Sequence, residues 1–492
     1  MPDTIALCLV SHTNTGKTTL ARTLLARDVG EVRDAAHVTI ESAAYVVAET
    51  PAGDRLELWD TPGFGDSARL ARRLAAHGDP IGWFLAEVWD RFRERPSWLA
   101  QKAVRSVRER ADVVLYLVNA TEVPRDAGYL QPELEILAWI GKPVVALLNQ
   151  TGRPRPREEE AAEVDRWRDA LQPHPLVRAV LPLDAFARCW VQEAVLLRAV
   201  REALPASREA VFDTLAGAWE AQRILQFDAA MDALARPIAN AALDRVTLAG
   251  IGLRSAWQTV GRAVGLRKGE PDDAASQAMR EMASRLDAAI RASTDALIAI
   301  HGLAGRAAQD VVTRLAANLT TSAPVHEGKA AVVGGVVSGA LSGLVADLAS
   351  GGVTFGAGMV AGGLLGALGG AGLARGYNVV RGTTSTEVRW SDAFLDSLVV
   401  GALLRYLAVA HYGRGRGDWT QSEHPAFWRD VAVREIEAHK ADWVAMWRDS
   451  AGRDAAAYTP RVAAALRASA VAVLDALYPG AMPALARTTP RA

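Results

Sequence analysis

The sequence predicts an α/β domain with a mostly parallel sheet and helices on both faces, followed by an all-α domain that contains a glycine-rich hydrophobic hairpin. Two observations carry this prediction. Short apolar runs alternate with helical patterns in the first part of the chain, and beyond it apolar residues recur only at helical spacing. We expect an α/β domain over 1–190, a helical part over 191–328, the hairpin over 329–376 and a second helical part over 377–492.

Composition limits the classes of protein that this chain can belong to. Its 492 residues exceed what one typical core organises, and its 55 basic and 56 acidic residues leave a net charge of −1. Bulk electrostatics therefore gives no indication of a nucleic-acid binder. The two cysteines, Cys8 and Cys189, lie far apart in apolar surroundings, which argues against disulfides and zinc. The first strand begins at the N-terminus, so we expect no signal peptide and a cytoplasmic location.

A phosphate-binding loop follows the first predicted strand. The apolar run 5–10 leads into Ser11-His12-Thr13-Asn14-Thr15-Gly16-Lys17-Thr18-Thr19, and residues 19–26 have a helical pattern. Backbone N–H groups in this loop and at the helix start favour phosphate oxygens. We expect Lys17 to reach the β- and γ-phosphates and Thr18 to ligate Mg²⁺. The residues expected to contact nucleotide are Ser11, Asn14, Thr15, Gly16, Lys17, Thr18 and Thr19.

The first position of this loop departs from the usual pattern. Ser11 stands where the consensus has glycine, and a left-handed backbone there would strain a serine. A chance Gly-Lys-Thr at a helix start is the alternative interpretation, which the strand and helix in register disfavour.

A second motif ends the third predicted strand. Residues 45–49 and 55–59 read as an antiparallel hairpin with a turn between them, and Asp60-Thr61-Pro62-Gly63 follows. Asp60 at a strand end can hold Mg²⁺ through water, and the Gly63 N–H can meet a γ-phosphate. A simple turn around Pro62 and Gly63 is the alternative. The phosphate loop upstream makes the nucleotide interpretation the stronger one.

The rest of the first domain continues the alternation of strands and helices. Residues 112–119, 142–149 and 177–183 read as buried strands, and parallel strands place a ligand at their carboxyl edge. Residues 67–110 read as helices in which tryptophans alternate with arginines. Contact with nucleic acid is one interpretation of that stretch, but an arginine-coated helix pair is commoner, so no nucleic-acid partner is expected.

These motifs carry a resemblance to a known family. Residues 1–190 resemble a translation-factor-class P-loop GTPase, nearest the TrmE/Era-like group, and the stretch 60–66 also resembles septin-like GTPases. The whole chain resembles a bacterial GTPase family with a C-terminal helical domain of unknown function. The resemblance implies that the chain binds GTP and GDP with Mg²⁺ and hydrolyses GTP. It also implies that Asn149 matches the first residue of the guanine motif Asn-Lys-x-Asp, Ala185 matches the base-covering loop, and Thr39 matches the switch threonine on Mg²⁺.

The guanine motif is incomplete in this chain. Gln150 replaces its lysine, and Gly152 replaces the aspartate that grips the guanine ring nitrogens. Loss of that charge-assisted pair of hydrogen bonds should weaken discrimination between guanine and adenine. Asp184, in the next loop, is an alternative source of a carboxylate.

Two further positions bear on hydrolysis. Phe64 stands where Ras-like enzymes carry a water-orienting glutamine, a pattern of GTPases that use another device or act only after assembly, such as a G-domain homodimer. Asn14 matches the residue that ligates K⁺ in potassium-stimulated relatives of TrmE, where the cation balances developing charge. A tolerated loop residue is the alternative for Asn14. The expected catalytic set is Lys17, Thr18, Gly63 and Asn14.

A glycine-rich apolar segment dominates the second half. Residues 330–374 contain a single charge, Asp347, with uncharged runs on either side of it, and basic residues flank the segment. Two series of glycines repeat every fourth residue, which lets helices approach closely: Gly335, Gly339 and Gly343, then Gly358, Gly362, Gly366 and Gly370. A hairpin that enters the inner face of the cytoplasmic membrane is one interpretation. A water-soluble helix pair packed inside the helical domain is the other.

Three functions are consistent with these patterns. The leading one is a GTPase whose nucleotide state positions a membrane-associated helical domain. The second is a nucleotide-binding scaffold with little hydrolysis, which Phe64 and the incomplete guanine motif favour. The third is a membrane-perturbing helical protein gated by its G domain.

Overall fold

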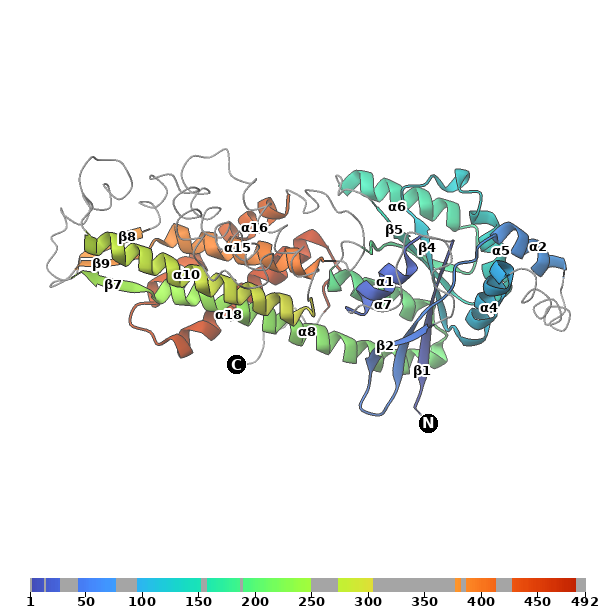
Figure 1. Ribbon diagram of the computed structural model, residues 1–492, viewed down its shortest axis with the longest axis horizontal. Coiled ribbons are helices and arrows are strands. Elements are labelled where there is room, and N and C mark those ends of the chain that lie inside the picture. Colours follow the sequence, from blue (N-terminus) through green and yellow to red (C-terminus); the bar gives the residue numbers. More distant parts are fainter. Residues whose placement is uncertain are drawn as a thin grey trace. The chain divides into compact units, whose positions relative to one another are not determined.

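The computed structural model describes residues 2–12, 15–26, 43–76, 95–151, 157–185, 189–248, 273–303, 377–381, 386–412 and 427–483 (Figure 1). The chain divides into two compact units. The first comprises Met1–Arg223 with His411–Trp419, and the second comprises Ile224–Ala410 with Thr420–Ala492. Helix α8 (Ala206–Leu243) contributes residues to both.

A six-stranded sheet forms the centre of the first unit. Its order is β2-β3-β1-β4-β5-β6, and every neighbouring pair is parallel except β2 with β3. The strands are β1 (Thr4–Ser11), β2 (Ala43–Glu49), β3 (Arg55–Asp60), β4 (Val113–Asn119), β5 (Val144–Asn149) and β6 (Val177–Pro182). The predicted hairpin and mostly parallel sheet are therefore confirmed. Parallel register places the carboxyl ends of β1, β3, β4, β5 and β6 at one edge.

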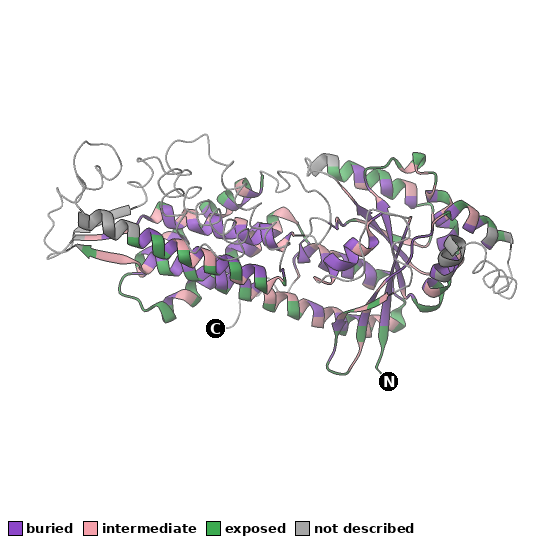
Figure 2. Cartoon of the chain, in the orientation of Figure 1, coloured by how far each residue is buried: buried purple, intermediate pink, exposed green. Residues whose placement is uncertain are grey.

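Helices cover both faces of this sheet, as predicted (Figure 1). Alternate residues of a strand point to opposite faces, and both sets are buried in β1 and β4, so each face needs a cover. One face packs against α2 (Ser67–Ala76), α4 (Arg95–Arg110), α5 (Leu130–Ile140) and α6 (Arg157–Leu171). Helices α1 (Lys17–Leu24) and α7 (Trp190–Ala203) contact the strands from the other. Figure 2 shows the buried residues concentrated between these layers.

The second unit is mainly helical. Besides the end of α8 it contains α10 (Asp273–Ile300), α15 (Asp392–Ala410), α16 (Phe427–Ala438), α17 (Lys440–Asp449) and α18 (Ala455–Leu477). Apolar positions expected to form core stripes are buried, for example Phe227, Leu234, Leu286 and Ile290. The helical pattern of the second half is therefore confirmed.

A small antiparallel sheet in the second unit corrects the expectation of an all-α domain. Its strands are β7 (Arg245–Leu248), β8 (Tyr377–Arg381) and β9 (Thr386–Trp390), in the order β7-β9-β8. Strand β7 has only four residues and pairs Arg245 with Arg389, far along the chain. So short a strand without a nearby partner gives no alternation that a sequence pattern can detect.

Helix α15 lies in the core of the second unit. It packs against α10, α16, α17 and α18, and within the described residues it is the helix long and apolar enough to cross a membrane, with 67% of its most apolar window buried. Buried Arg405 on α15 donates to Ser293 Oγ at 2.8 Å and to Thr294 Oγ1 at 3.0 Å on α10. Burial lowers the pKa of Arg405 to about 10. These contacts fix α15 against α10.

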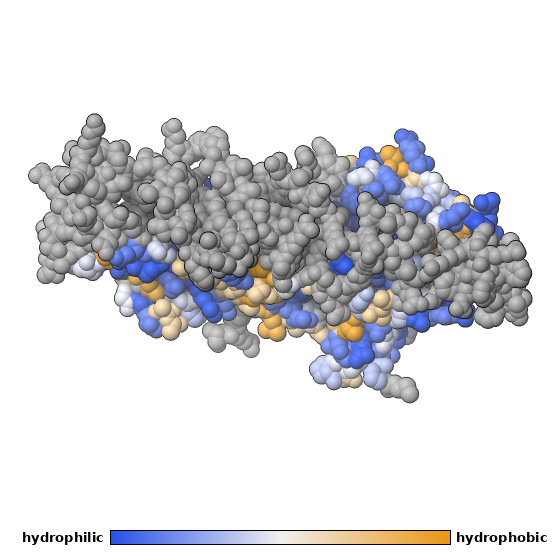
Figure 3. All heavy atoms as spheres, in the orientation of Figure 1, coloured by the Kyte–Doolittle hydropathy of each residue, from blue (hydrophilic) through white to orange (hydrophobic). Residues whose placement is uncertain are grey.

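The predicted glycine-rich hairpin, with its flanking and repeating residues in 329–376, lies outside the described residues. On the face shown in Figure 3, the described residues are mostly hydrophilic with isolated hydrophobic ones between them. The large apolar side chains that are exposed in the described part are Val46, Val123, Leu225, Phe427 and Val433.

Candidate functional site

The loop between β1 and α1 begins the site. Gly16 caps the start of α1 with φ 87°, a left-handed conformation that favours glycine. A Cβ on Gly16 would lie 2.9 Å from the Nδ2 atom of Asn149, so a side chain there would also collide with the last residue of β5. Glycine is therefore required at this position for two reasons, and it directs the N-terminus of α1 toward the carboxyl edge of the sheet.

The ammonium of Lys17 is held inside this loop. Its Nζ donates to Ser11 Oγ at 2.8 Å and to the His12 carbonyl at 3.4 Å, and the Thr15 hydroxyl donates to the same two acceptors. Burial lowers the pKa of Lys17, while the carboxylates of Asp60 and Glu133 act in the opposite direction. Two hydrogen bonds thus hold this buried side chain in place at the phosphate loop.

The backbone strain expected at Ser11 is not found. It ends β1 and is absent from the non-glycine residues with positive φ in the described part of the chain, so the serine adopts an ordinary extended conformation. Its hydroxyl accepts from Lys17 and donates to the His12 carbonyl at 2.6 Å. Serine in place of glycine therefore adds a polar contact to the loop.

Asp60 closes the other side of the loop. Its Oδ2 atom accepts a hydrogen bond of 2.6 Å from the Thr18 hydroxyl, while its Oδ1 atom is buried with no hydrogen-bond partner in the described structure. Burial raises the pKa of Asp60, against the lowering effects of the Thr18 hydrogen bond and of nearby Lys17 and Arg22. A buried carboxylate oxygen without a donor is costly, and it suits a cation that would replace the missing donor.

Magnesium fits this pair of residues. A hydroxyl and a carboxylate are hard oxygen ligands, and Mg²⁺ in proteins is often held by one or two such groups together with substrate phosphates and water. Among the described residues no cluster of three or more His, Cys, Asp or Glu side chains could hold a metal ion unaided. A cation beside Thr18 and Asp60 would therefore take its remaining ligands from phosphate and water.

The turn after β3 is fastened to the end of β1. The Thr61 hydroxyl donates to the Leu9 carbonyl at 2.6 Å, and the Phe64 N–H donates to the Ser11 carbonyl at 3.2 Å. Gly63 lies between these two anchors, beside the phosphate loop. Phe64 is fully buried in the core of the domain, so its side chain is a packing group.

Asn149 joins three loops at the same edge. Its Nδ2 donates to the Thr15 carbonyl at 2.7 Å, and its Oδ1 accepts from the Ala185 N–H at 2.8 Å. The Ala185 carbonyl in turn accepts from the Thr23 hydroxyl of α1 at 2.9 Å. The loops after β1, β5 and β6 are thereby locked together, and Gln150 between them has a left-handed backbone with φ 58°.

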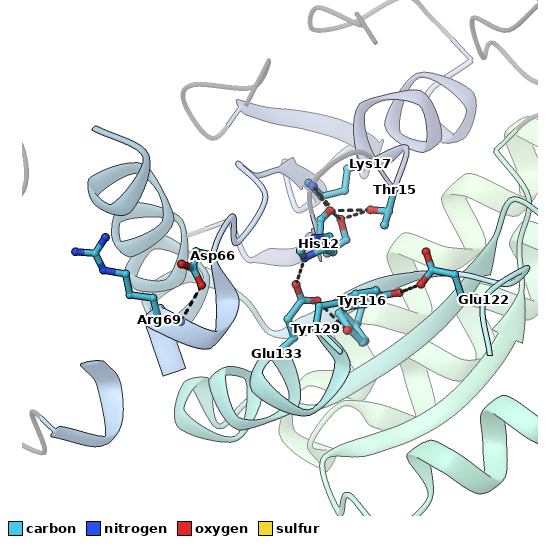
Figure 4. A network of polar contacts seen from close by, with 10 residues as sticks. His12, Thr15, Lys17, Asp66, Arg69, Tyr116, Glu122, Tyr129 and Glu133 are labelled. Carbon is cyan, nitrogen blue, oxygen red and sulfur yellow. Dashed lines mark hydrogen bonds and ion pairs between the residues drawn. The ribbon is translucent and has the colours of Figure 1, made fainter. Parts of the chain in front are cut away.

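A polar network behind the loop escaped the sequence analysis (Figure 4). Buried Glu133 on α5 contacts His12 Nδ1 at 3.0 Å and accepts from the Tyr116 hydroxyl at 2.8 Å. The His12 ring stacks on Tyr129 with centroids 4.6 Å apart, and Tyr129 donates to Glu122 at 2.7 Å. Burial raises the pKa of Glu133, against its contact with His12. The one sequence signal was a glutamate within the apolar face of a helix.

The predicted site residues have three outcomes. Ser11, Thr15, Gly16, Lys17, Thr18, Asp60, Gly63, Asn149 and Ala185 come together at the carboxyl edge, in loops that contact one another. Thr19 is buried in the first turn of α1. Asn14 and Thr39 lie outside the described residues, as does Gly152.

Two family profiles match the chain. Residues 6–150 match the profile described as "50S ribosome-binding GTPase". Residues 170–472, more than half of the chain, match the profile "Domain of unknown function (DUF3482)". No curated protein matches the chain.

Three solved structures show distant likenesses to the chain. Era from Aquifex aeolicus bound to GDP·AlF4⁻ is 22% identical with a TM-score of 0.29, covering 41% of this chain and 57% of that one. Era in complex with MgGDPNP and a 16S ribosomal RNA fragment is 21% identical with a TM-score of 0.29, covering 42% and 58%. A bacterial dynamin pair is 10% identical with a TM-score of 0.20, covering 95% and 77%. TM-scores at this level do not define a function.

The profile match over residues 6–150, the phosphate loop and the sheet order agree on the nature of the first unit. It is a P-loop GTPase domain with the nucleotide-site motifs at one edge of the sheet. The chain belongs to the family of the DUF3482 domain, and the match to that domain begins at residue 170, beyond the GTPase match that ends at residue 150.

Proposed function

We propose that this protein binds GTP as its Mg²⁺ complex and hydrolyses it to GDP and phosphate, with a site nearest in kind to the TrmE/Era-like GTPases. The observation that carries the proposal is the buried Oδ1 atom of Asp60, which lacks a donor beside Thr18 and the Lys17 ammonium. The Lys17 ammonium can bind an anion, and the Thr18 hydroxyl and the Asp60 carboxylate can bind a cation. A ligand that fits all three groups is therefore an anion that carries a cation with it. A nucleoside triphosphate with Mg²⁺ meets that need.

Each residue of the site has a distinct role in this proposal. Lys17 would leave Ser11 and His12 to bond the β- and γ-phosphates, and Thr18 and Asp60 would hold Mg²⁺, which neutralises phosphate charge when bound. The Gly63 N–H would donate to the γ-phosphate. The N–H groups of Thr15, Gly16 and Thr19 belong to the loop and helix start that would surround the phosphates. Asn149 and Ala185 would form the floor of the base site.

Hydrolysis needs a device other than a glutamine after Gly63, because Phe64 is buried in the core. We propose that K⁺ held by Asn14 balances charge on the transferring phosphate, and that Thr39 closes on Mg²⁺ in the GTP state. Pairing of two G domains is a second route to the same assistance. The alternative is a scaffold that binds GTP and hardly hydrolyses it.

We also propose that the nucleotide state is coupled to a membrane. The uncharged, glycine-rich stretch 330–374 has the length and small-residue spacing of a hairpin that enters a bilayer, and it is flanked by basic residues. In this proposal the protein works in the cytoplasm at the inner face of the cytoplasmic membrane. The hairpin acting as a membrane-perturbing element under control of the G domain is the stronger form of the same idea.

The nucleotide site is tested by Lys17→Ala. Removing a buried ammonium that donates charge-assisted hydrogen bonds to phosphate should lower GTP affinity by about 100-fold or more, measured by isothermal titration. Lys142→Ala is the matched control, because Lys142 precedes β5 at the opposite edge of the sheet, and it should bind GTP like the wild type. Unchanged binding by the Lys17 variant, with its fold intact by circular dichroism, rules out the site.

The hydrolysis step is tested by phosphate release in K⁺ against Na⁺ buffer. We expect release that is faster in K⁺, and Asn14→Ala should remove this difference while GTP still binds. Release near the uncatalysed rate in both buffers, across a range of protein concentrations, would favour the scaffold.

The membrane proposal is tested by flotation with anionic liposomes. The full chain should float, and a chain from which 330–374 is deleted should stay at the bottom of the gradient while still binding GTP. Equal flotation of the two proteins would show that residues 330–374 are not needed for membrane binding.

The network behind the loop is tested by a double-mutant cycle on His12 and Glu133. Each alanine variant should lose about tenfold in GTP affinity, and the double variant should lose no more, because Glu133 acts through His12. Tyr116→Phe is the control, since it keeps the His12–Glu133 contact and should lower only the unfolding temperature. Additive losses, or losses of stability alone, would show that Glu133 does not position the loop.

A further inference from the structure

We infer that Asp184 is the carboxylate that reads the nucleobase, and that this side chain makes the site selective for guanine. The inference rests on the proposed function and concerns its base end. Asp184 lies two residues after the end of β6 and precedes Ala185, whose N–H donates to Asn149. It replaces the missing acidic group of the loop after β5 from a different strand.

Contacts of Asp184 place its carboxylate beside that loop. Its Oδ2 atom accepts from the Thr151 N–H at 3.0 Å and from the Thr151 hydroxyl at 2.9 Å. Two donors from one residue hold the Oδ2 atom beside the loop after β5. The acidic group therefore belongs to the shared edge of the loops after β5 and β6.

The sheet order tells which end of a nucleotide would meet Asp184. With the phosphates on the loop after β1, the cation site at Asp60 lies toward β3. Asn149 lies on the other side of β1, at the end of β5 and beyond β4, and its amide donates to the Thr15 carbonyl of the phosphate loop. The nucleoside must leave the phosphate loop on that side, because the β3 side is taken by the cation site. Its base would then lie against the loops that carry Asn149 and Asp184.

Asn149 itself is a poor candidate for telling guanine from adenine. Its amide oxygen and nitrogen both bond protein backbone, at Ala185 and Thr15. Gly152 has no side chain, and among the described residues of the two loops Asp184 is the acidic one. The discriminating charge therefore has to come from Asp184.

The chemistry of the bases makes this choice specific. Guanine presents the N1–H and the exocyclic amino group as two donors on one edge, whereas adenine presents an acceptor nitrogen there. A carboxylate accepts about four hydrogen bonds and donates none when ionised, so it can serve Thr151 and both guanine donors together. Adenine would leave the carboxylate facing a lone pair, with no donor for it at that edge.

The test is Asp184→Asn with GTP, XTP and ATP in isothermal titration of the full chain. Xanthine offers a donor at N1 and an acceptor at position 2, which match an amide. The amide oxygen would accept the N1–H of xanthine, and the amide nitrogen would donate to the oxygen at position 2. We expect GTP affinity to fall by roughly 30-fold and XTP affinity to rise by a similar factor. Asp169→Asn, an exposed carboxylate on α6, is the matched control and should leave all three affinities unchanged.

Other outcomes separate failure of this inference from failure of the proposed function. If the wild type binds GTP but the variant keeps the wild-type ratio of GTP to XTP affinity, Asp184 does not read the base. If Asp184→Ala weakens GTP, XTP and ATP equally, Asp184 only supports the Thr151 turn, and the inference is again overturned. Equal affinity of the wild type for GTP and ATP would contradict guanine selectivity, and no binding of either would overturn the proposed function along with it.

Discussion

A buried ammonium that feels the charge of two buried carboxylates is the constraint on which the nucleotide site depends. Lys17, Asp60 and Glu133 are all almost fully buried. Burial lowers the pKa of Lys17 and raises the pKa of Asp60 and of Glu133, which favours the neutral form of each group. Burying these ionisable groups costs desolvation free energy, so the arrangement does not serve the stability of the fold alone. It is reasonable where a further anion and cation are to be bound, because the charges are then already in position.

The parallel register of the sheet brings these groups together. The β1 loop, the β3 end, the β5 end and the β6 end meet at one edge, and side chains then fasten them to one another. Asn149 bonds the loops after β1 and β6, and Thr61 ties the turn after β3 to β1. A ligand at this edge would therefore contact a single set of loops that are joined by hydrogen bonds. A displacement of one loop would strain its hydrogen bonds to the others.

The features that could be predicted from the sequence are those that lie within one short stretch of the chain. The strand–loop–helix around Gly16 and Lys17 and the strand end at Asp60 each lie within one short stretch, so composition and spacing were enough. Contacts between distant positions were not predictable: His12 and Glu133 are 121 positions apart. The sheet that pairs Arg245 with Arg389 was missed for the same reason. The expected strain at Ser11 was wrong because the consensus glycine there does not imply a left-handed backbone.

The most direct measurement is isothermal titration of GTP, with and without Mg²⁺, into the wild type and into Asp60→Ala. If Thr18 and Asp60 form the cation site, Mg²⁺ should raise the affinity of the wild type for GTP by about tenfold or more, and should leave that of the variant nearly unchanged. Wild-type binding that is independent of Mg²⁺, or a variant that gains as much from Mg²⁺ as the wild type does, would contradict the account.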